Sequence, residues 1–339
     1  MATVGLAVVG LLVVIALAAD FIANDRPLAI KWDGKVYFPV VRGYLVDLDI
    51  AEWQPEFRNK KFKKLIELDA DANADGKENQ DLKPKAQSLD WVLFPPIPFS
   101  PNDFDLNSVI TPPSWRHWLG TDDTGRDLMS RLIHGTRISL SIGVVAVSIY
   151  ITIGVIFGSM AGYFGGWVDV LISRMIELMI CFPTFFLIIA IVAYLPQSIY
   201  NIMIVIGVTG WAGVARLVRG EFLRLRNIDY VQAARALGFG WSRIIFRHIL
   251  PNALAPVFVS ATFGVAVAIL TESSLSFLGF GVPPTTASWG SILAKAREIL
   301  PAGWWLTTFP GLAIFLTVTV LNLVGEGLRD AMDPRLARR

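Results

Sequence analysis

Long apolar runs separated by short polar segments dominate the pattern of this chain. A membrane-spanning helix needs about 20 mostly apolar residues, and six runs meet that requirement. They cover roughly residues 4 to 23, 138 to 161, 170 to 194, 199 to 217, 251 to 272 and 306 to 326. The pattern predicts an all-α polytopic membrane protein with six transmembrane helices.

The first apolar run has an alternative interpretation. Ala16, Leu17 and Ala18 resemble the small-residue cleavage site of a secretory signal peptide. However, no Lys or Arg precedes the run, and the run is long enough to span a membrane. We therefore expect residues 1–23 to form a retained first transmembrane helix.

Composition agrees with a membrane protein. The chain has 339 residues, of which 54% are hydrophobic and 17% are charged, whereas soluble domains contain about 25% charged residues. The net charge of +2 gives no indication of a nucleic-acid partner. Cys181 is the single cysteine, which excludes an intrachain disulfide, and we expect it to pack in the core.

Basic residues indicate which ends of the spans face the cytoplasm, because Lys and Arg accumulate in short cytoplasmic loops. They concentrate between the fourth and fifth spans and after the sixth span. With six spans, this asymmetry predicts that both termini are cytoplasmic, including a tail over residues 331–339. The residues concerned are Arg216, Arg219, Arg224, Arg226, Arg235, Arg243, Arg247, Arg329, Arg335, Arg338 and Arg339.

Residues 24–136 are predicted to form a soluble extracytoplasmic insert between the first and second spans. Its basic and acidic residues nearly balance, so it does not resemble a polybasic lipid-binding segment. The run from Lys35 to Phe38 is typical of a strand. A helix with one apolar face is indicated by Phe57, Phe62, Leu65, Ile66 and Leu68.

One stretch of the insert is similar in part to a calcium-binding loop. Asp71, Asn73 and Asp75 occupy the first, third and fifth positions, and Gly76 follows. The twelfth position, where a bidentate Glu is required, holds Leu82. A solvated acidic turn is therefore the favoured interpretation, with a weak calcium site as the alternative.

The motifs of nucleotide hydrolysis and metal catalysis are missing from the sequence. No Gly-Lys pair precedes Ser or Thr as in a P-loop, and His117, His134 and His248 form no HExxH pair. The chain is therefore predicted not to be an enzyme and to bind no cofactor. If transport consumes ATP, the ATP and magnesium must bind to another subunit.

Charged residues inside the spans are costly and by default indicate function. Arg174 and Glu177 lie one helical turn apart and can satisfy each other, so a structural ion pair is the favoured interpretation there. Pro183 is predicted to kink the same span. Glu272 and Glu326 lie near span ends, where a charge costs less.

The basic segment over residues 224–250 reads as two short helices. Asp229 and Gln232 suit a reciprocal N-terminal cap, and Gly238 suits a left-handed stop. A second helix is predicted from Trp241, and Pro251 begins the next span. A simple amphipathic helix at the membrane surface is the structural alternative.

The order of these residues resembles the EAA loop of ABC importer permeases. The matching positions lie on a loop that the arginines place inside the cell, and two of them depart from the family pattern, with Gln232 replacing Glu and His248 replacing Ile. The resemblance implies that this loop docks ATPase subunits through Gln232, Ala233, Ala234, Gly238, His248, Leu250 and Pro251.

Two flanking segments narrow the resemblance to the C-type subunit of dipeptide and oligopeptide permeases. They are residues 119–127, with the sequence LGTDDTGRD, and residues 274–290, which contain SLSFLG and end in SWG. The start of the insert, from Ile22 to Pro27, is similar to that of microcin C and peptide permeases. Read structurally, Thr121 to Arg131 would cap and begin an amphipathic helix on the membrane's outer face, and residues 276–290 would make a re-entrant turn.

The resemblance implies a type I ABC importer permease over residues 137–330, in a bacterial cytoplasmic (inner) membrane. Its implied partners are a second homologous permease, two ATPase subunits or one fused ATPase, and an extracytoplasmic peptide-binding protein. The rival class is an ion-coupled secondary transporter, against which stand the lack of an inverted repeat and of a carboxylate relay. Residues assigned to a possible pathway or gate are Glu177, Pro183, Glu272, Gly279, Pro283 and Trp289.

Overall fold

The computed structural model describes residues 2–32, 34–53, 57, 62, 89–300 and 302–332. The chain folds as two compact units. The helical unit comprises Met1–Val13, Ile138–Leu300 and Leu306–Arg339, and the sheet unit comprises Val14–Arg137 and Pro301–Trp305. The calcium-loop candidate at Asp71, Asn73 and Asp75 lies outside the described residues, as does most of the helix expected around Leu65.

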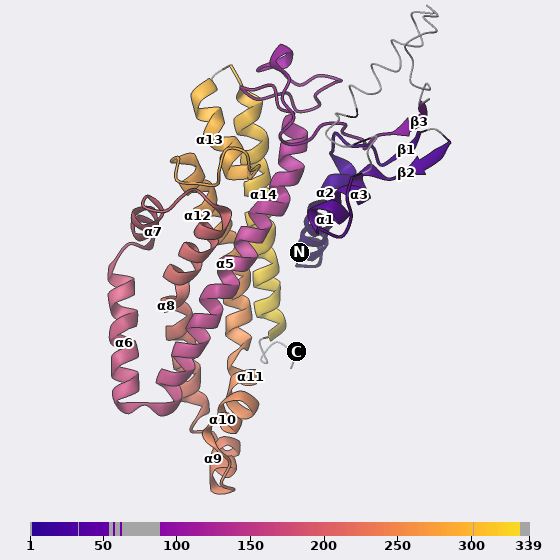
Figure 1. The fold of residues 1–339 in the computed structure, drawn as a ribbon. Helices are drawn as coiled ribbons and strands as arrows, with labels where there is room; N and C mark the ends of the chain where they lie inside the picture. The colour runs from indigo at the N-terminus through magenta and orange to yellow at the C-terminus, as the bar shows by residue number, and fades with distance from the viewer. Residues whose placement is uncertain are drawn as a thin grey trace, which may run out of the picture. The chain divides into compact units, whose positions relative to one another are not determined.

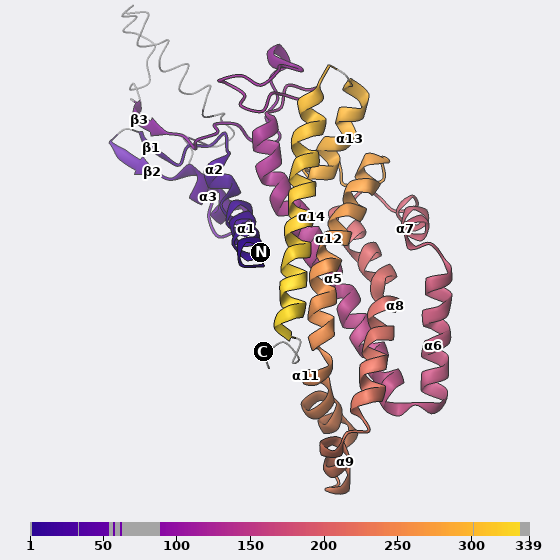
Figure 2. The same cartoon turned by 180° about the vertical axis from the view of Figure 1, so that it is seen from behind.

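The apolar runs form long helices that lie side by side in the helical unit (Figures 1 and 2). In chain order, the main helices are α1 (Ala2–Leu17), α5 (Leu128–Phe164), α6 (Gly166–Cys181), α7 (Thr184–Val192), α8 (Ile199–Leu225), α12 (Ala255–Phe277), α13 (Trp289–Ile299) and α14 (Trp304–Met332). Helices α6, α7 and α12 each pack against α8, which is therefore central to the unit.

The described helices account for the predicted six spans in part. Four described helices are long and apolar enough to cross a membrane, namely α5, α8, α12 and α14. The run predicted over residues 170 to 194 is broken into α6 and α7, which meet at 82°. The break falls at Phe182 and Pro183, as predicted, because proline lacks the N–H that would continue the helix. Counting the bent pair as one span gives five, and α1 is shorter, with 16 residues.

Glycines on α5 allow that helix to approach α8 closely. A Cβ atom added at Gly154 would lie 2.7 Å from Val214 Cβ, and one at Gly158 would lie 2.6 Å from the Ala215 carbonyl oxygen. Gly162 continues this series at the same four-residue spacing. Small residues at such spacing let helices pack closely within a membrane, where apolar burial alone gives little driving force.

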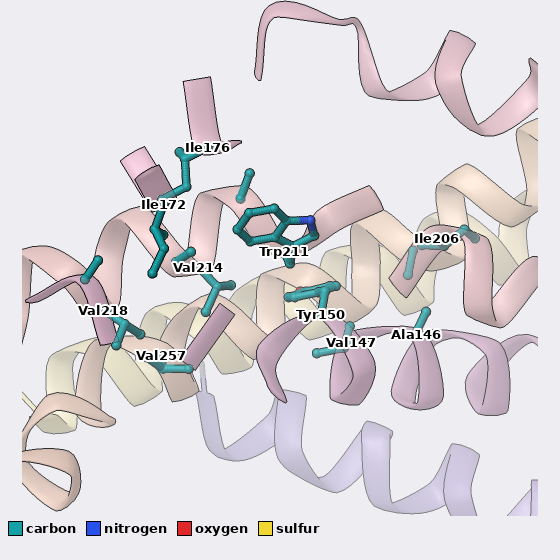
Figure 3. Packing of buried hydrophobic residues seen from close by; sticks show 14 of the residues in the cluster. Ala146, Val147, Tyr150, Ile172, Ile176, Ile206, Trp211, Val214, Val218 and Val257 are labelled. Carbon is teal, nitrogen blue, oxygen red and sulfur yellow. The ribbon is translucent and has the colours of Figure 1, made fainter. Parts of the chain in front are cut away.

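The core of the helical unit lies between α5, α6 and α8 (Figure 3). Tyr150 of α5 and Trp211 of α8 are both buried there, and Ile172 and Ile176 reach the cluster from α6. Cys181, by contrast, is exposed at the end of α6, so its expected core position is wrong. The apolar pattern identifies the helix but not which of its faces is covered.

The sheet unit contains three antiparallel strands in the order β2-β1-β3. They are β1 (Ala29–Trp32), β2 (Lys35–Tyr37) and β3 (Leu89–Leu93). Strands β1 and β2 are neighbours both in the chain and in the sheet. Ile30 pairs with Tyr37 on one side and Val92 on the other. The strand predicted at Lys35 is confirmed, so the all-α description applies to the helical unit alone.

Among its described residues, the sheet unit also contains two short α-helices and an ion cluster around Asp20. The helices are α2 (Ala19–Ile22) and α3 (Pro39–Asp47). Arg137 donates to the Ala16 carbonyl oxygen at 2.8 Å and to the Asp20 carboxylate at 2.8 Å, and Tyr44 also donates to Asp20. These contacts join Arg137 of α5 to the end of α1 and to α2.

The helix predicted from Thr121 to Arg131 forms only in its last turn. Residues 121–127 make a tight loop closed by a bridge between Thr121 and Asp127, and α5 begins at Leu128. The Asp122 carboxylate accepts the backbone N–H groups of Thr124 and Arg126. An aspartate that bonds the backbone in this way stabilises a turn in competition with a helix.

Candidate functional site

The basic candidate segment lies between α8 and α12, and we call it the coupling segment (residues 226–253). It contains α9 (Asp229–Ala236), α10 (Trp241–Arg243), a π-helix (Ile244–Ile249) and α11 (Leu250–Ala253). Figure 1 shows α9 and α10 beyond the end of α8, at the tip of the helical unit. This placement leaves much of their surface free to contact a partner.

The start of α9 differs from the predicted cap. Asp229 is the first helical residue rather than the cap, and the capping position is Ile228, whose side chain makes no capping hydrogen bond. Gln232 instead donates from Nε2 to the Asn227 carbonyl oxygen at 3.0 Å. Asp229 still contributes favourably, because a negative charge in the first turn complements the helix dipole.

The turn after α9 agrees with the prediction. Gly238 has φ +78°, a left-handed conformation that side chains with a Cβ adopt at a cost. Its N–H donates to the Arg235 carbonyl oxygen, and the Phe239 N–H donates to that of Ala234. This pair of bonds is the Schellman ending of a helix, and it turns the chain sharply toward α10.

The coupling segment buries one face and exposes another. Val231 and Ala234 of α9 are buried, as are Ile244, Ile245 and Ile249 of the π-helix. The outward face carries large apolar side chains, with Leu237 73%, Trp241 58% and Phe246 66% exposed. Gln232 and Ala233 are exposed, while His248 and Leu250 are half-buried.

Arginines lie among these exposed apolar side chains. Arg243 stacks over the Phe239 ring, with Cζ 4.0 Å from the ring centroid, and the His248 ring is parallel to Phe239 at 6.0 Å. Within the described part of the chain, Arg235, Arg243 and Arg247 form no ion pair with a carboxylate. The face therefore suits a protein partner that supplies apolar contacts and acidic groups.

The residues assigned to a pathway do not gather at one place. Glu177 is exposed on α6 and pairs with Arg174 at 2.5 Å, as expected from their spacing. Pro183 marks the α6–α7 bend. Gly279 lines a cavity of about 270 Å³ near the end of α12, together with Gln197 and Lys295.

Glu272 is fully buried on α12. Its Oε1 accepts the hydroxyls of Ser276 and Ser288, each at 2.8 Å. Ser288 also caps α13, whose first residue, Trp289, is buried and donates from its N–H to the Ser139 hydroxyl oxygen at 3.2 Å. Glu272 thus joins α12 to the start of α13, while Pro283 lies in the connection between them. The sequence did not predict α13 as a helix.

A groove in the helical unit escaped the sequence reasoning. It has a volume of about 330 Å³ and is lined by residues of α5, α7, α8 and α12. The Tyr150 side chain lies against Gly264, where an added Cβ would collide with its hydroxyl oxygen, and against Gly210, where an added Cβ would lie 3.1 Å from the ring. Hydroxyls of Ser260 and Thr271 add polar groups to this wall. Glycines and hydroxyls inside apolar runs were the available signal.

The second segment with motif character, residues 117–131, forms a buried polar cluster in the sheet unit. His117 Nδ1 lies 2.9 Å from Asp127 Oδ2, and Arg126 Nε donates to Asp122 Oδ2 at 2.7 Å. Arg131 is also buried, with Nε 3.9 Å from Asp122. Burial alone would raise the pKa of Asp122. The charges of Arg126 and Arg131 and two backbone N–H groups lower this pKa by more, so the net shift is downward.

Sequence comparisons with known proteins match this chain to transport proteins. The family model described as "binding-protein-dependent transport system inner membrane component" matches residues 154–338, which include the coupling segment. A dipeptide transport system permease protein of Alkalihalophilus pseudofirmus is 42% identical over 247 residues, covering 72% of this chain and 81% of that protein. An oligopeptide transport system permease protein of Bacillus subtilis is 41% identical over 250 residues, covering 73% and 82%. A solved methionine ABC transporter chain gives a TM-score of 0.48 at 16% identity, covering 61% of this chain and 98% of that chain.

Proposed function

Because the chain belongs to the family of binding-protein-dependent transport system inner membrane components, we propose that it is one permease subunit of an ATP-driven peptide importer. Its curated relatives are dipeptide and oligopeptide transport permeases rather than enzymes. In the proposal, this chain forms half of the translocation pathway. The start of the insert resembles microcin C and peptide permeases, so the proposed cargo includes peptide derivatives of that type.

The observation that carries the proposal is the exposed face of the coupling segment. It presents apolar side chains beside three arginines that have no acidic partner within the described residues. A surface of that kind is expensive to leave uncovered and fits a protein interface. In the proposal, ATPase subunits dock there, and ATP and magnesium bind to those subunits.

The remaining parts of the proposal follow the residue pattern and the family. A second homologous permease completes the pathway, and an external peptide-binding protein delivers the cargo. The protein has six spans in a bacterial inner membrane with both termini in the cytoplasm, and residues 24–136 lie outside. The broken α6–α7 pair supports one of these spans, and α1 another.

Reconstitution tests the proposed activity. The chain is co-expressed with the neighbouring permease, ATPase and binding-protein genes, purified and placed in liposomes. We expect the ATPase subunits to co-purify and labelled dipeptide or oligopeptide to enter only with ATP and binding protein. Uptake by this chain alone, driven by a pH gradient, would instead establish the rival secondary transporter.

Cysteine labelling tests the orientation. In a Cys181→Ser background, a cysteine replaces either Lys35 of β2 or Gly240 of the coupling segment, both of which are exposed. An impermeant thiol reagent added to cells with a permeabilised outer envelope should label the Lys35 position and spare the Gly240 position. The reverse pattern would invert the proposed topology.

A further inference from the structure

The turn between α5 and α6 lies beside the coupling segment although it is distant in sequence. A single residue, Gly165, separates the end of α5 at Phe164 from the start of α6 at Gly166. Gly165 and Gly166 have φ +67° and +55°, in the left-handed region that glycine tolerates best. So short a turn has little slack, and a displacement at one side reaches both helices.

Two aromatic side chains at this turn contact the coupling segment from both sides of Gly238. Arg235 of α9 lies over the Tyr163 ring, with Cζ 5.3 Å from its centroid. Trp241 of α10 contacts Phe164, with ring centroids 5.7 Å apart. The two short helices of the coupling segment therefore each engage one of two consecutive residues.

Polar bonds hold the same turn against the end of α8. Arg226 donates from Nη1 to the Gly162 carbonyl oxygen at 3.0 Å. Arg219 makes a two-pronged contact with Asp169 of α6, one arm of which measures 2.8 Å. Such bidentate pairs fix orientation as well as distance. The turn is thus a defined part of the cytoplasmic end of the helical unit.

The chain connectivity indicates which helices depend on these contacts. Helices α8 and α12 are joined to the coupling segment by the chain itself, so movement of the segment reaches them covalently. Helices α5 and α6 have no such connection and depend on side-chain contacts. Tyr163 and Phe164 supply two of them, beside the Arg226 bond to Gly162, at the one-residue turn where a displacement is shared by both helices.

We propose that the α5–α6 turn receives the movement of the coupling segment, with Tyr163 and Phe164 as positioning residues that transmit it to two spans. This inference rests on the proposed function, since it requires ATPase subunits to move the segment. Loss of the two rings leaves docking and hydrolysis in place and weakens the connection of the coupling segment to α5 and α6, of which the Arg226 bond to Gly162 remains. The result is ATP hydrolysis with little transport.

The test uses the full reconstituted importer and the ratio of peptide uptake to ATP hydrolysis. For Tyr163→Ala with Phe164→Ala, we expect membrane levels and ATPase co-purification like the parent. Uptake per ATP should fall about tenfold, the effect of losing one cation–π and one aromatic contact. The single variant Tyr163→Phe keeps the ring and leaves Phe164 intact, so its ratio of uptake to ATP hydrolysis should equal that of the parent.

Trp167→Ala is the matched control. Trp167 lies on the same turn, but its side chain is 85% exposed, and it has no aromatic or cation–π contact with the segment within the described residues. Its removal should leave the ratio unchanged. An equal fall in Trp167→Ala would overturn the inference, because the turn would then be sensitive to any substitution.

A double-mutant cycle covers the case in which the alanine pair fails to accumulate. Arg235→Gln changes the contact from the coupling segment, and Tyr163→Leu changes it from the turn. We expect each to lower uptake per ATP and the combination to add little. Fully additive effects would overturn the inference, and so would an alanine pair whose uptake per ATP equals that of the parent. Either result leaves the proposed function standing as long as the parent shows ATP-driven uptake. A parent that takes up no peptide with ATP would defeat the proposed function itself.

Discussion

Residues 117–131 of the sheet unit and the coupling segment of the helical unit are both rich in charge, yet they use it differently. In the first, Asp122, Arg126, Asp127 and Arg131 are buried and lie against one another. In the second, the arginines lie at the surface among exposed apolar side chains. Both segments carry motif residues of one family, so motif character alone does not distinguish folding from docking.

Burial explains the difference. A charge removed from water is tolerated when it is paired and hydrogen-bonded, and removing one partner leaves the other uncompensated. An exposed charge keeps its hydration and remains available to a partner. The first segment should therefore respond to substitution by failing to fold, and the second by failing to couple.

Asp122→Ala should give the largest effect. The substitution leaves Arg126 and Arg131 buried without the Asp122 carboxylate that faced them, which lowers the free energy of unfolding by about 3–5 kcal/mol. We expect little full-length protein in the membrane and a lower unfolding temperature in detergent. The control is Asp90→Ala in β3, whose pair with Lys31 at 3.2 Å is exposed and should contribute about 0–1 kcal/mol. Equal accumulation of both variants would contradict the folding role.

Gly238→Asp should separate accumulation from coupling. A side chain at this left-handed position costs about 1–2 kcal/mol. A Cβ added at Gly238 would have no neighbouring atom within 4 Å, so the cost comes from the backbone conformation and not from a clash. We expect near-normal membrane levels with weakened ATPase association or hydrolysis uncoupled from uptake. Gly238→Ala should be milder, because its cost is mostly the backbone conformation. If both variants assemble and import like the parent, the coupling segment is not the coupling element.

Much of the helical unit was predictable because the bilayer imposes a strong pattern. The apolar runs located α5, α8, α12 and α14, and Pro183 located the break between α6 and α7. Spacing also paired Arg174 with Glu177. Each of these follows from a local rule that needs no knowledge of tertiary contacts.

The predictions failed where side chains compete with the backbone or where distant segments meet. The segment from Thr121 to Arg131 was expected to cap and begin a helix, but the helix begins only at Leu128, because the Asp122 carboxylate binds backbone N–H groups and holds a turn. Asp229 fitted a cap but is the first helical residue. The contacts of Tyr163 and Phe164 join residues about 70 positions apart in sequence, which periodicity cannot show.

Acid should affect the sheet unit through Asp122. Its pKa in the folded protein is below the ordinary value of 3.8, so its stabilising contribution is fully present above that pH and is lost as pH falls through the folded pKa. We expect the unfolding temperature of the purified protein to drop as the pH falls below about 4. Asp122→Asn, if it accumulates, should show a shallower drop. An identical pH profile would show that other carboxylates dominate.

Arg247→Gln should give the smallest effect and sharpen the comparison most directly. The Arg247 side chain is exposed and forms no ion pair within the described residues, so its removal should leave folding unchanged. A single exposed ion pair with a partner contributes about 0.2–1 kcal/mol, so ATPase-subunit affinity should fall about two- to fivefold. The affinity is measured by titrating ATPase subunit onto purified permease at low and high salt, and the difference between variant and parent should shrink in high salt because surface pairs are screened. Lys35→Gln is the matched control, since it removes one exposed charge from the sheet unit and should leave the affinity unchanged. A loss of affinity in Lys35→Gln equal to that in Arg247→Gln would mean that net charge, rather than the coupling segment, attracts the ATPase.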